Sequence, residues 1–456
     1  MNKTLIYKLL ALAAMALILI FALGRIEWKV QERQATRDSA VAGIASQYAE
    51  AQQIAGPLLW LQCSESQSVT RFDEKNQPRV EQEQLDCSRF IRPESVTGVG
   101  SLDVSERYRG IYKARVYLAN LRIKAQFDPV KFKLQPRQTL QAAYWVFNVS
   151  DPRGLKRIDV RDGQNKPMDV QPGTVDSPLG GGFHIPQPLE SLDQPHTLTV
   201  DIQLAGSGRM DWVPVGASND FRLTSAWPHP AFSGNYLPET REIGAAGFTA
   251  HWRINDFATG GDAVLAQGPA NAVEGGSEYA QNGQTPRTGF QHAFGVSLID
   301  PVDAYVQSDR AVRYGFLFIL LTLGGFFLFE LLKRQAIHPL QYLLTGFAVV
   351  VFFLLLLALS EHTGFVIAYL IAAAVCTALI ATYGRTLLGS WKASAVLGVG
   401  YAGLFAGLYQ LLASEDHALL MGAWLTFIVL AATMYLTRKL DWRDAGRAPR
   451  AQAEVE

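Results

Sequence analysis

Two short polar loops between long apolar stretches hold the residues whose types and spacing could support chemistry in this 456-residue chain. The candidate functional cluster consists of Glu361, His362, Glu415, Asp416 and His417. Because both loops are predicted on the same side of the apolar stretches, their carboxylates and imidazoles could converge to bind a metal such as Zn²⁺ or to relay a proton. The alternative is that short solvated loops simply contain polar residues. No His-Glu-x-x-His or comparable ligand spacing accompanies them, so we predict no metal and no other cofactor.

A single acidic residue, Glu330, lies inside one of the apolar stretches, where a buried carboxylate would be a functional candidate. It precedes Lys333 and Arg334, and the alternative is that it snorkels to the membrane edge or pairs there with either cation. Apart from Glu330, the centres of the five C-terminal apolar stretches carry no charge. Coupled transporters usually carry ionisable residues or broken helices at mid-membrane, so this pattern argues against a transporter, although a path for a neutral substrate stays open.

Residues 227–238 form a candidate binding segment in which aromatic and imidazole side chains alternate with prolines. The residues in question are Trp227, His229, Phe232 and Tyr236. A rigid extended backbone with exposed rings could dock a peptide or a glycan, whereas the alternative is a long connection packed on a β domain. The chain has no P-loop, nucleophile-elbow, Cys-x-x-Cys or kinase motif, so we predict no catalytic residue and no enzymatic activity.

Six apolar stretches must position these residues. Five are almost uncharged and about 20 residues long, which is the length of helix that crosses a bilayer of about 30 Å. They occupy residues 311–332, 340–359, 364–383, 393–413 and 418–436. The sixth, residues 5–23, is interrupted only by Lys8 and is either a signal peptide or an uncleaved anchor; its length favours the anchor. The sequence therefore predicts a six-helix transmembrane bundle in a lipid bilayer.

Basic residues in the short loops predict the orientation of this bundle. They lie at the N-terminal end of the first stretch and then in alternate loops, at Lys3, Lys8, Lys333, Arg334, Arg385, Lys392, Arg438, Lys439 and Arg443. The other loops, 360–363 and 414–417, contain neither Lys nor Arg. Both termini are therefore expected in the cytoplasm, and residues 25–310 on the outside.

The outside segment has the composition of a soluble protein. Residues 25–53 predict a helix that continues the first stretch and ends at Gly56-Pro57. Residues 121–127, 197–204 and 248–255 alternate between apolar and polar types, which predicts strands with one buried face. The fold expected from these strands and their turn signals is an antiparallel β-sandwich.

The chain contains three cysteines. Cys63 and Cys87 form a candidate disulfide, since such bonds persist in oxidising compartments; two thiols too far apart to meet are the alternative. Cys376 lies in an apolar stretch and is expected to be a small packing residue.

The chain has no net charge, because Lys and Arg together number 41 and Asp and Glu together also number 41. No basic run is present, so nucleic acid is not an expected partner.

Several motifs together resemble the CreD family of inner-membrane proteins. They are Trp-Pro-His-Pro at 227–230, Leu-Pro-Glu-Thr-Arg-Glu-Ile at 237–243, Gly-Phe-Thr-Ala-His-Trp at 247–252, Phe-Gly-Val-Ser-Leu-Ile-Asp-Pro-Val-Asp-Ala-Tyr at 294–305, His-Pro-Leu-Gln-Tyr-Leu at 338–343 and Leu-Ser-Glu-His-Thr-Gly-Phe at 359–365. Residues 56–63 depart from the family's usual Gly-Pro-apolar-Pro run. The resemblance implies a bacterial inner-membrane protein linked to cell-envelope integrity and to a two-component stress response. It carries over no catalytic residue.

The fold predicted is an α+β polytopic membrane protein with a large periplasmic domain between its first and second transmembrane helices. The expected parts are an anchor (1–24), a membrane-proximal helix (25–55), a β-rich domain (56–310), a five-helix bundle (311–436) and a cytoplasmic tail (437–456). We expect a non-enzymatic protein whose periplasmic domain binds an envelope component or a membrane protein. The alternatives are a permease or flippase-like protein for a neutral or lipidic substrate, and a membrane enzyme with a His/carboxylate site on the outside face.

Overall fold

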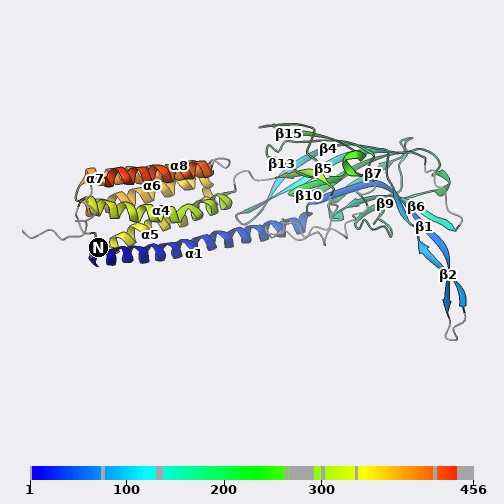
Figure 1. Ribbon diagram of the computed structural model, residues 1–456. Coiled ribbons are helices and arrows are strands. Elements are labelled where there is room, and N and C mark those ends of the chain that lie inside the picture. Colours follow the sequence, from blue (N-terminus) through cyan, green and yellow to red (C-terminus); the bar gives the residue numbers. More distant parts are fainter. Residues whose placement is uncertain are drawn as a thin grey trace, which may run out of the picture. The chain divides into compact units, whose positions relative to one another are not determined.

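The chain consists of two compact units, which are described separately. The computed structural model describes residues 3–72, 78–129, 137–261, 265, 292–298, 303–333, 337–413 and 418–438. The helical unit comprises Met1–Ser39 and Val302–Glu456, and the β unit comprises Ala40–Pro301 (Figure 1).

The helical unit is built from long apolar helices. Its helices are α1 (Lys3–Tyr48), whose last turns belong to the β unit, α4 (Ala304–Lys333), α5 (Pro339–Thr363), α6 (Phe365–Leu388), α7 (Trp391–Ala413) and α8 (Ala418–Thr437). Among the described residues, α1, α4, α5, α6 and α7 contain segments long and apolar enough to cross a membrane. The transmembrane prediction is thus confirmed for five helices. The span predicted at 418–436 coincides with a helix, and its crossing of the membrane stays a prediction.

The expected end of α1 is wrong. The helix continues beyond residue 25 as predicted, but it ends at Tyr48, and Gly56-Pro57 lies inside strand β1. The pairing of β1 with β6 shifts register between Ala55 and Leu58, so the Gly-Pro step forms a bulge. Proline lacks the N–H that a regular ladder needs, and Gly56 has a φ of 131°, which favours glycine. The same dipeptide that ends helices also bends strands, and here it bends a strand.

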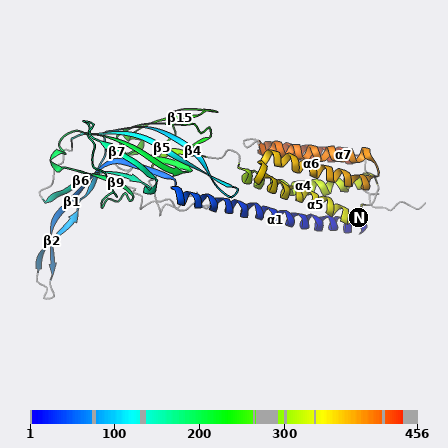
Figure 2. The ribbon, with the colours of Figure 1, turned by 180° about the vertical axis from the view of Figure 1, so that it is seen from behind.

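The β unit contains two sheets (Figures 1 and 2). Sheet A has nine strands in the order β13-β16-β11-β1-β6-β9-β8, with β2 and β3 also paired to β1, and sheet B has seven in the order β14-β15-β12-β4-β5-β10-β7. The strands are β1 (Gln52–Phe72), β2 (Pro78–Asp86), β3 (Arg89–Ile91), β4 (Ser95–Arg109), β5 (Tyr112–Phe127), β6 (Gln138–Val149), β7 (Leu155–Arg161), β8 (Gln171–Pro172), β9 (Gly182–Gln187), β10 (His196–Ser207), β11 (Arg209–Val213), β12 (Ser218–Ser225), β13 (Pro230–Gly234), β14 (Thr240–Gly244), β15 (Gly247–Asn255) and β16 (Phe294–Leu298).

The three strands predicted from alternation are confirmed as β5, β10 and β15. The expectation of purely antiparallel sheets is wrong, because β1 pairs in parallel with β11 and β12 pairs in parallel with β4. Alternation with a period of two reports which face of a strand is buried and carries no information on strand direction. The α+β class is confirmed.

The two sheets share one apolar core, as expected of a sandwich-like domain. Trp145 of sheet A packs on Phe127 of sheet B with ring centroids 4.5 Å apart. Trp252 of sheet B lies 5.3 Å from Phe294 of sheet A, also between centroids. Aromatic pairs of this kind add to the free energy gained by burying apolar area, and they hold the two layers together.

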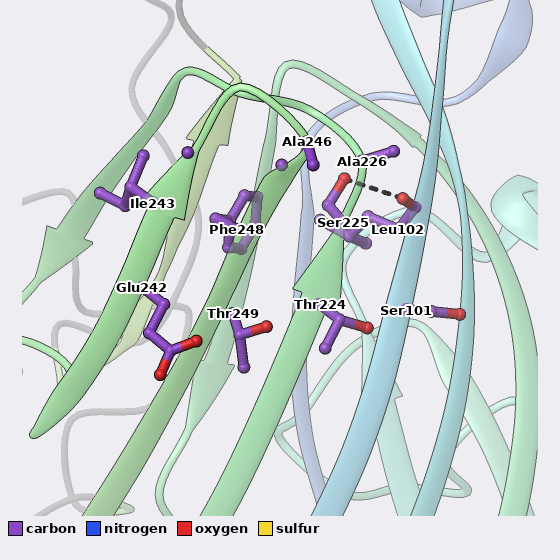
Figure 3. A pocket seen from close by; sticks show the side chains of 12 residues that line it. Ser101, Leu102, Thr224, Ser225, Ala226, Glu242, Ile243, Ala246, Phe248 and Thr249 are labelled. Carbon is purple, nitrogen blue, oxygen red and sulfur yellow. Dashed lines mark hydrogen bonds between the residues drawn. The ribbon is translucent and has the colours of Figure 1, made fainter.

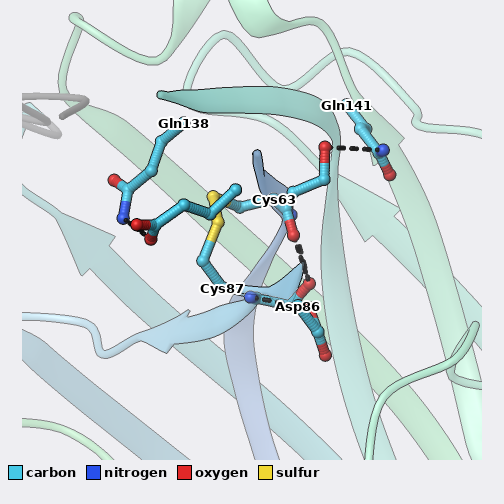
Figure 4. Close-up of a disulfide and its surroundings, with 8 residues drawn as sticks. Cys63, Asp86, Cys87, Gln138 and Gln141 are labelled. Atoms are coloured by element: carbon cyan, nitrogen blue, oxygen red, sulfur yellow. Dashed lines mark hydrogen bonds between the residues drawn. A yellow bond between two sulfur atoms is a disulfide. The ribbon is translucent and has the colours of Figure 1, made fainter. Parts of the chain in front are cut away.

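One two-stranded arm extends from sheet A, and a disulfide lies at its base. The ladder between β1 and β6 ends at Glu65. Residues 64–72 of β1 pair with β2 in an antiparallel register, from Ser64 with Asp86 to Phe72 with Pro78. The structure joins Cys63 to Cys87 by a disulfide with 4.9 Å between their Cα atoms (Figure 4). An isolated two-stranded ribbon is marginally stable in water, so the covalent link fixes the arm where it leaves the sheet.

Replacing both Cys63 and Cys87 by serine should lower the free energy of unfolding of the β unit by about 3 kcal/mol, because the bond no longer restricts the unfolded chain. The arm should also become more sensitive to proteases. Thermal unfolding and limited proteolysis of the purified full-length protein, without reductant, measure both effects. The control is Cys376→Ser, which removes the buried free cysteine of α6. Equal cleavage between residues 63 and 87 in the wild type and the double variant would contradict the role given to the disulfide.

Candidate functional site

The predicted cluster at the ends of the helices is only partly described. Glu361 lies in the last turns of α5 with its side chain 7% exposed, and His362 beside it is exposed. Glu415, Asp416 and His417 lie outside the described residues, so their convergence with Glu361 and His362 stays a prediction. Within the described part of the chain, no group of three or more His, Cys, Asp or Glu residues is placed to hold a metal ion.

Glu361 belongs to a polar cluster that joins three helices, here called the Arg33 cluster: Arg33 of α1, Tyr305 of α4 and Glu361 of α5. The Tyr305 hydroxyl donates a hydrogen bond to Glu361 Oε1 at 3.2 Å, and Arg33 Nε lies 3.4 Å from the same oxygen. One turn further along α1, the guanidinium of Arg37 pairs with the carboxylate of Asp303 and lies 5.6 Å from the centre of the Tyr305 ring. The carboxylate of Glu361 is therefore already occupied by a cation and a hydroxyl.

A second cluster also combines a cation, a glutamate and a tyrosine from the same three helices. It is called here the Lys8 cluster: Lys8 of α1, Glu330 of α4 and Tyr342 of α5. The Glu330 carboxylate pairs with the Lys8 ammonium, and the Tyr342 hydroxyl donates to Glu330 Oε2 at 2.6 Å. The side chains of Lys8 and Glu330 are 31% and 12% exposed. The sequence predicts that Glu330 pairs locally with Lys333 or Arg334, whereas the structure gives it a partner 322 residues away.

The two clusters follow from one antiparallel packing of α1 on α4. Lys8 pairs with Glu330, a Cβ added at Gly315 would lie 2.7 Å from Leu23, and Arg33 shares Glu361 with Tyr305. The two residue numbers have the same sum in each of these cross-helix pairs: 8 and 330, 23 and 315, 33 and 305. The register between the helices therefore does not slip from one cluster to the other.

The buried side of α1 has the spacing that such packing requires. Leu19, Leu23, Ile26 and Val30 are buried, at steps of four, three and four residues, and Arg33 continues the series. This 3.5-residue period keeps one stripe of a helix against its neighbours. Gly346 of α5 provides the space for Leu19, because a Cβ at this glycine would overlap the leucine. At 1.5 Å per residue, Lys8 and Arg33 are about 37 Å apart, so the clusters bracket a hydrocarbon layer of about 30 Å.

Aromatic rings fill the described centre of the helical unit. Phe352 of α5 lies 4.5 Å from Phe405 of α7 and 5.4 Å from Tyr369 of α6, between ring centroids. Phe318 of α4 lies 5.9 Å from Phe405, and all four side chains are buried. The Tyr369 hydroxyl donates to the Phe405 carbonyl at 2.7 Å. A centre packed in this way offers no polar path at the level of these rings.

The aromatic-proline segment packs on the core of the β unit. Trp227, Phe232 and Tyr236 are half-buried against that core. Phe232, in β13, makes edge contacts with Phe248 and Trp252 at 5.8 and 5.7 Å between centroids. The Tyr236 hydroxyl donates to the Ala258 carbonyl, and burial raises the pKa of this phenol. These contacts favour the packed connection over an exposed docking segment, although His229 itself is exposed.

A polar hollow of about 630 Å³ lies over four strands of sheet B (Figure 3). Its floor is a row of direct cross-strand partners, Glu242, Thr249, Thr224 and Ser101, from β14, β15, β12 and β4. The Ser225 hydroxyl, on its margin, donates to the Leu102 carbonyl at 2.9 Å. The sequence does not predict this row, because each strand contributes one ordinary polar residue. The arrangement can form hydrogen bonds with a ligand, and its lining includes no nucleophile–base pair.

Comparison with known proteins gives a match over nearly the whole chain. The family model described as "Inner membrane protein CreD" matches residues 4–443. The chain is 33% identical over 459 residues to the "Inner membrane protein CreD" of Escherichia coli (strain K12), covering 100% of this chain and 97% of that relative. These matches confirm the resemblance found in the sequence motifs.

Replacing Glu330 by alanine should destabilise the helical unit by about 1–3 kcal/mol, because the Lys8 ammonium and the Tyr342 hydroxyl lose their acceptor in a partly buried place. The double variant Lys8→Met/Glu330→Leu should recover most of this loss, since apolar residues can replace a buried ion pair. Thermal unfolding of the detergent-solubilised protein measures both. Glu32→Gln, in the exposed pair with Lys29, is the control and should cost less than about 1 kcal/mol. Loss of stability in the double variant equal to that of Glu330→Ala would contradict the pairing.

Proposed function

Because the chain belongs to the CreD family of inner membrane proteins, we propose that it contributes to cell-envelope integrity and to the envelope stress response as a non-enzymatic binding protein. In this proposal the β unit binds an envelope component or a membrane protein, and the helical unit anchors it. The observation that carries the proposal is a contrast between the units. The described centre of the helical unit is packed with aromatic rings, whereas the β unit presents polar hollows to solvent.

The β unit is proposed to lie in the periplasm, with both termini in the cytoplasm. The disulfide between Cys63 and Cys87 supports this side, because disulfides persist in oxidising compartments. The basic residues of alternate loops support the same orientation. The Lys8 and Arg33 clusters support retention of α1 as an uncleaved helix, because Lys8 inside its apolar stretch and Arg33 beyond that stretch are paired with α4 and α5.

The two alternative functions have less support. A permease or flippase-like path would need a polar route through the helical unit, and the contacts among Phe318, Phe352, Tyr369 and Phe405 argue against one at their level. A membrane enzyme built on the outside-face loops would need an available carboxylate. Glu361 already accepts a hydrogen bond from Tyr305 and pairs with Arg33.

The orientation predicts where an external protease can cut. A cleavage site inserted between Gly110 and Ile111, in the turn that joins β4 to β5, should be cut in intact spheroplasts. The same site placed after Glu456 should be cut only after the membrane is permeabilised. Immunoblotting of both fragments provides the readout. Cleavage at Gly110 that required permeabilisation would place the β unit in the cytoplasm and contradict the proposal.

The binding role predicts adducts from the β unit in living cells. A photo-crosslinking amino acid at Thr249, in the hollow over sheet B, should form a specific adduct with an envelope protein or glycan. The matched control is the same probe at Leu370 of α6, which is 62% exposed on an apolar helix and should form adducts mainly with lipid. Adducts are identified by mass spectrometry after purification. Probes at exposed positions throughout the β unit that gave no adduct would contradict a binding role for this unit.

A further inference from the structure

An aromatic row crosses sheet A of the β unit. Phe90 of β3 is the cross-strand partner of Trp60 of β1, Trp60 is the partner of Tyr144 of β6, and Tyr144 is the partner of Pro186 of β9. Direct partners in a sheet project from the same face, so three aromatic rings and the ring of Pro186 lie in one row. The Trp60 and Phe90 rings are in contact, with centroids 4.5 Å apart.

The row lies on the face of sheet A that points away from sheet B. Trp145, the residue after Tyr144, packs inward on Phe127 of sheet B, and successive residues of a strand point to opposite faces. Within the row, Trp60 is only 6% exposed and is not available to a ligand. Tyr144 is half-buried and reaches the surface, where it lines a hollow of about 720 Å³.

The wall opposite Tyr144 is the loop 172–181, whose backbone is held in an unusual conformation. Val175 has a φ of 56°, which is rare for a β-branched residue and persists only where the surroundings enforce it. The Thr174 hydroxyl donates to the Gly180 carbonyl, and the Gly173 N–H donates to the Gly182 carbonyl. These bonds close the loop and preform this wall of the hollow.

Polar groups of several kinds surround the Tyr144 ring. His184 lies edge-on to it, 5.5 Å between centroids, and His184 Nδ1 is 2.8 Å from the Gly173 carbonyl. A carbonyl only accepts, so Nδ1 carries the proton, and in the neutral ring Nε2 is an acceptor. The Asp176 carboxylate lines the same hollow, as does Ser177, whose buried hydroxyl oxygen has no hydrogen-bond partner among the described residues.

We propose that this hollow is a saccharide-binding site. A sugar ring presents C–H groups to an aromatic face and hydroxyls, which both donate and accept, to its edge. Tyr144 supplies the aromatic face, while the Asp176 carboxylate and His184 Nε2 supply acceptors for the sugar hydroxyls. Asp176 is the one carboxylate or cation-forming side chain besides His184 in this lining, so the ligand class is a neutral oligosaccharide. The inference rests on the proposed function and deepens it, since it assigns a chemical class to the envelope component bound.

Titration of the full-length protein in nanodiscs with chitotetraose, cellotetraose and maltotetraose tests the site. Calorimetry should detect binding of at least one of them. Tyr144→Ala should weaken this binding about tenfold, which is the upper range for loss of one aromatic contact. Asp176→Asn, which preserves shape, should also weaken it. The control is Tyr108→Ala in β4, because Tyr108 is 66% exposed and its hydroxyl binds Glu106, away from the hollow; it should leave the affinity unchanged. Thermal unfolding of each variant verifies folding.

Three results would overturn the proposal. They are no binding of any of the three sugars at millimolar concentration, equal affinity in Tyr144→Ala, Asp176→Asn and wild type, and binding of a proline-rich peptide in the hollow in place of the sugars. Failure here is distinguishable from failure of the proposed function. If crosslinking from the β unit captures a protein while no sugar binds, the binding role stands and only the saccharide class falls.

Discussion

The pairing of Lys8 with Glu330 is the interaction on which the helical unit depends. A charge within an apolar helix is costly in hydrocarbon. Lys8 is the one charged residue of the stretch 5–23, and Glu330 is the one acidic residue of the stretch 311–332. Pairing them, with a hydroxyl from Tyr342, offsets that cost only if α1 lies against α4 and α5 at one height. The first helix of the chain therefore packs on α4 and α5, which follow the entire β unit in sequence. The β unit is consequently an insertion between two helices that pack on each other.

The Arg33 cluster repeats this logic at the other end of the same helices, with the roles exchanged. In the Lys8 cluster α4 provides the glutamate and α5 the tyrosine; in the Arg33 cluster α5 provides the glutamate and α4 the tyrosine. Lipid tails are as apolar as leucine, so the stripe from Leu19 to Val30 gains little from burial alone and relies on close packing at Gly315 and Gly346. Such packing tolerates slippage by a turn, whereas two polar clusters at a fixed separation do not. The clusters therefore specify the register, and the apolar stripe supplies the contact area.

Local patterns predicted local features well. Apolar length predicted the helices, and alternation predicted β5, β10 and β15, because both signals lie within a few consecutive residues. Features that depend on distant partners were missed. Nothing near Glu330 in sequence indicates Lys8, and alternation does not distinguish the parallel pairing of β12 with β4 from an antiparallel one. Lys8 and Glu330, which lie in two different apolar stretches, were a usable signal, since two opposite charges that both need a partner can satisfy each other. The Gly56-Pro57 error has a different origin, because the step interrupts helices and strands alike.

The presence of an internal cation separates carboxylates that stabilise the fold from carboxylates that could bind a ligand. Glu330 and Glu361 each have a cation and a tyrosine hydroxyl as partners, so their hydrogen-bonding capacity serves the packing of α1 on α4 and α5. The carboxylates that line the two hollows of the β unit, Glu242 and Asp176, stand beside hydroxyl and ring groups instead of cations. Glu242 lies on sheet B, and Asp176 on a loop over sheet A, so the two hollows occupy different layers of the sandwich. A carboxylate without an internal cation is satisfied by water or by a ligand, and in the linings of these two hollows Glu242 and Asp176 are such carboxylates. This distribution of partners favours ligand recognition by the β unit. Glu330 and Glu361 of the helical unit serve the packing of its own helices.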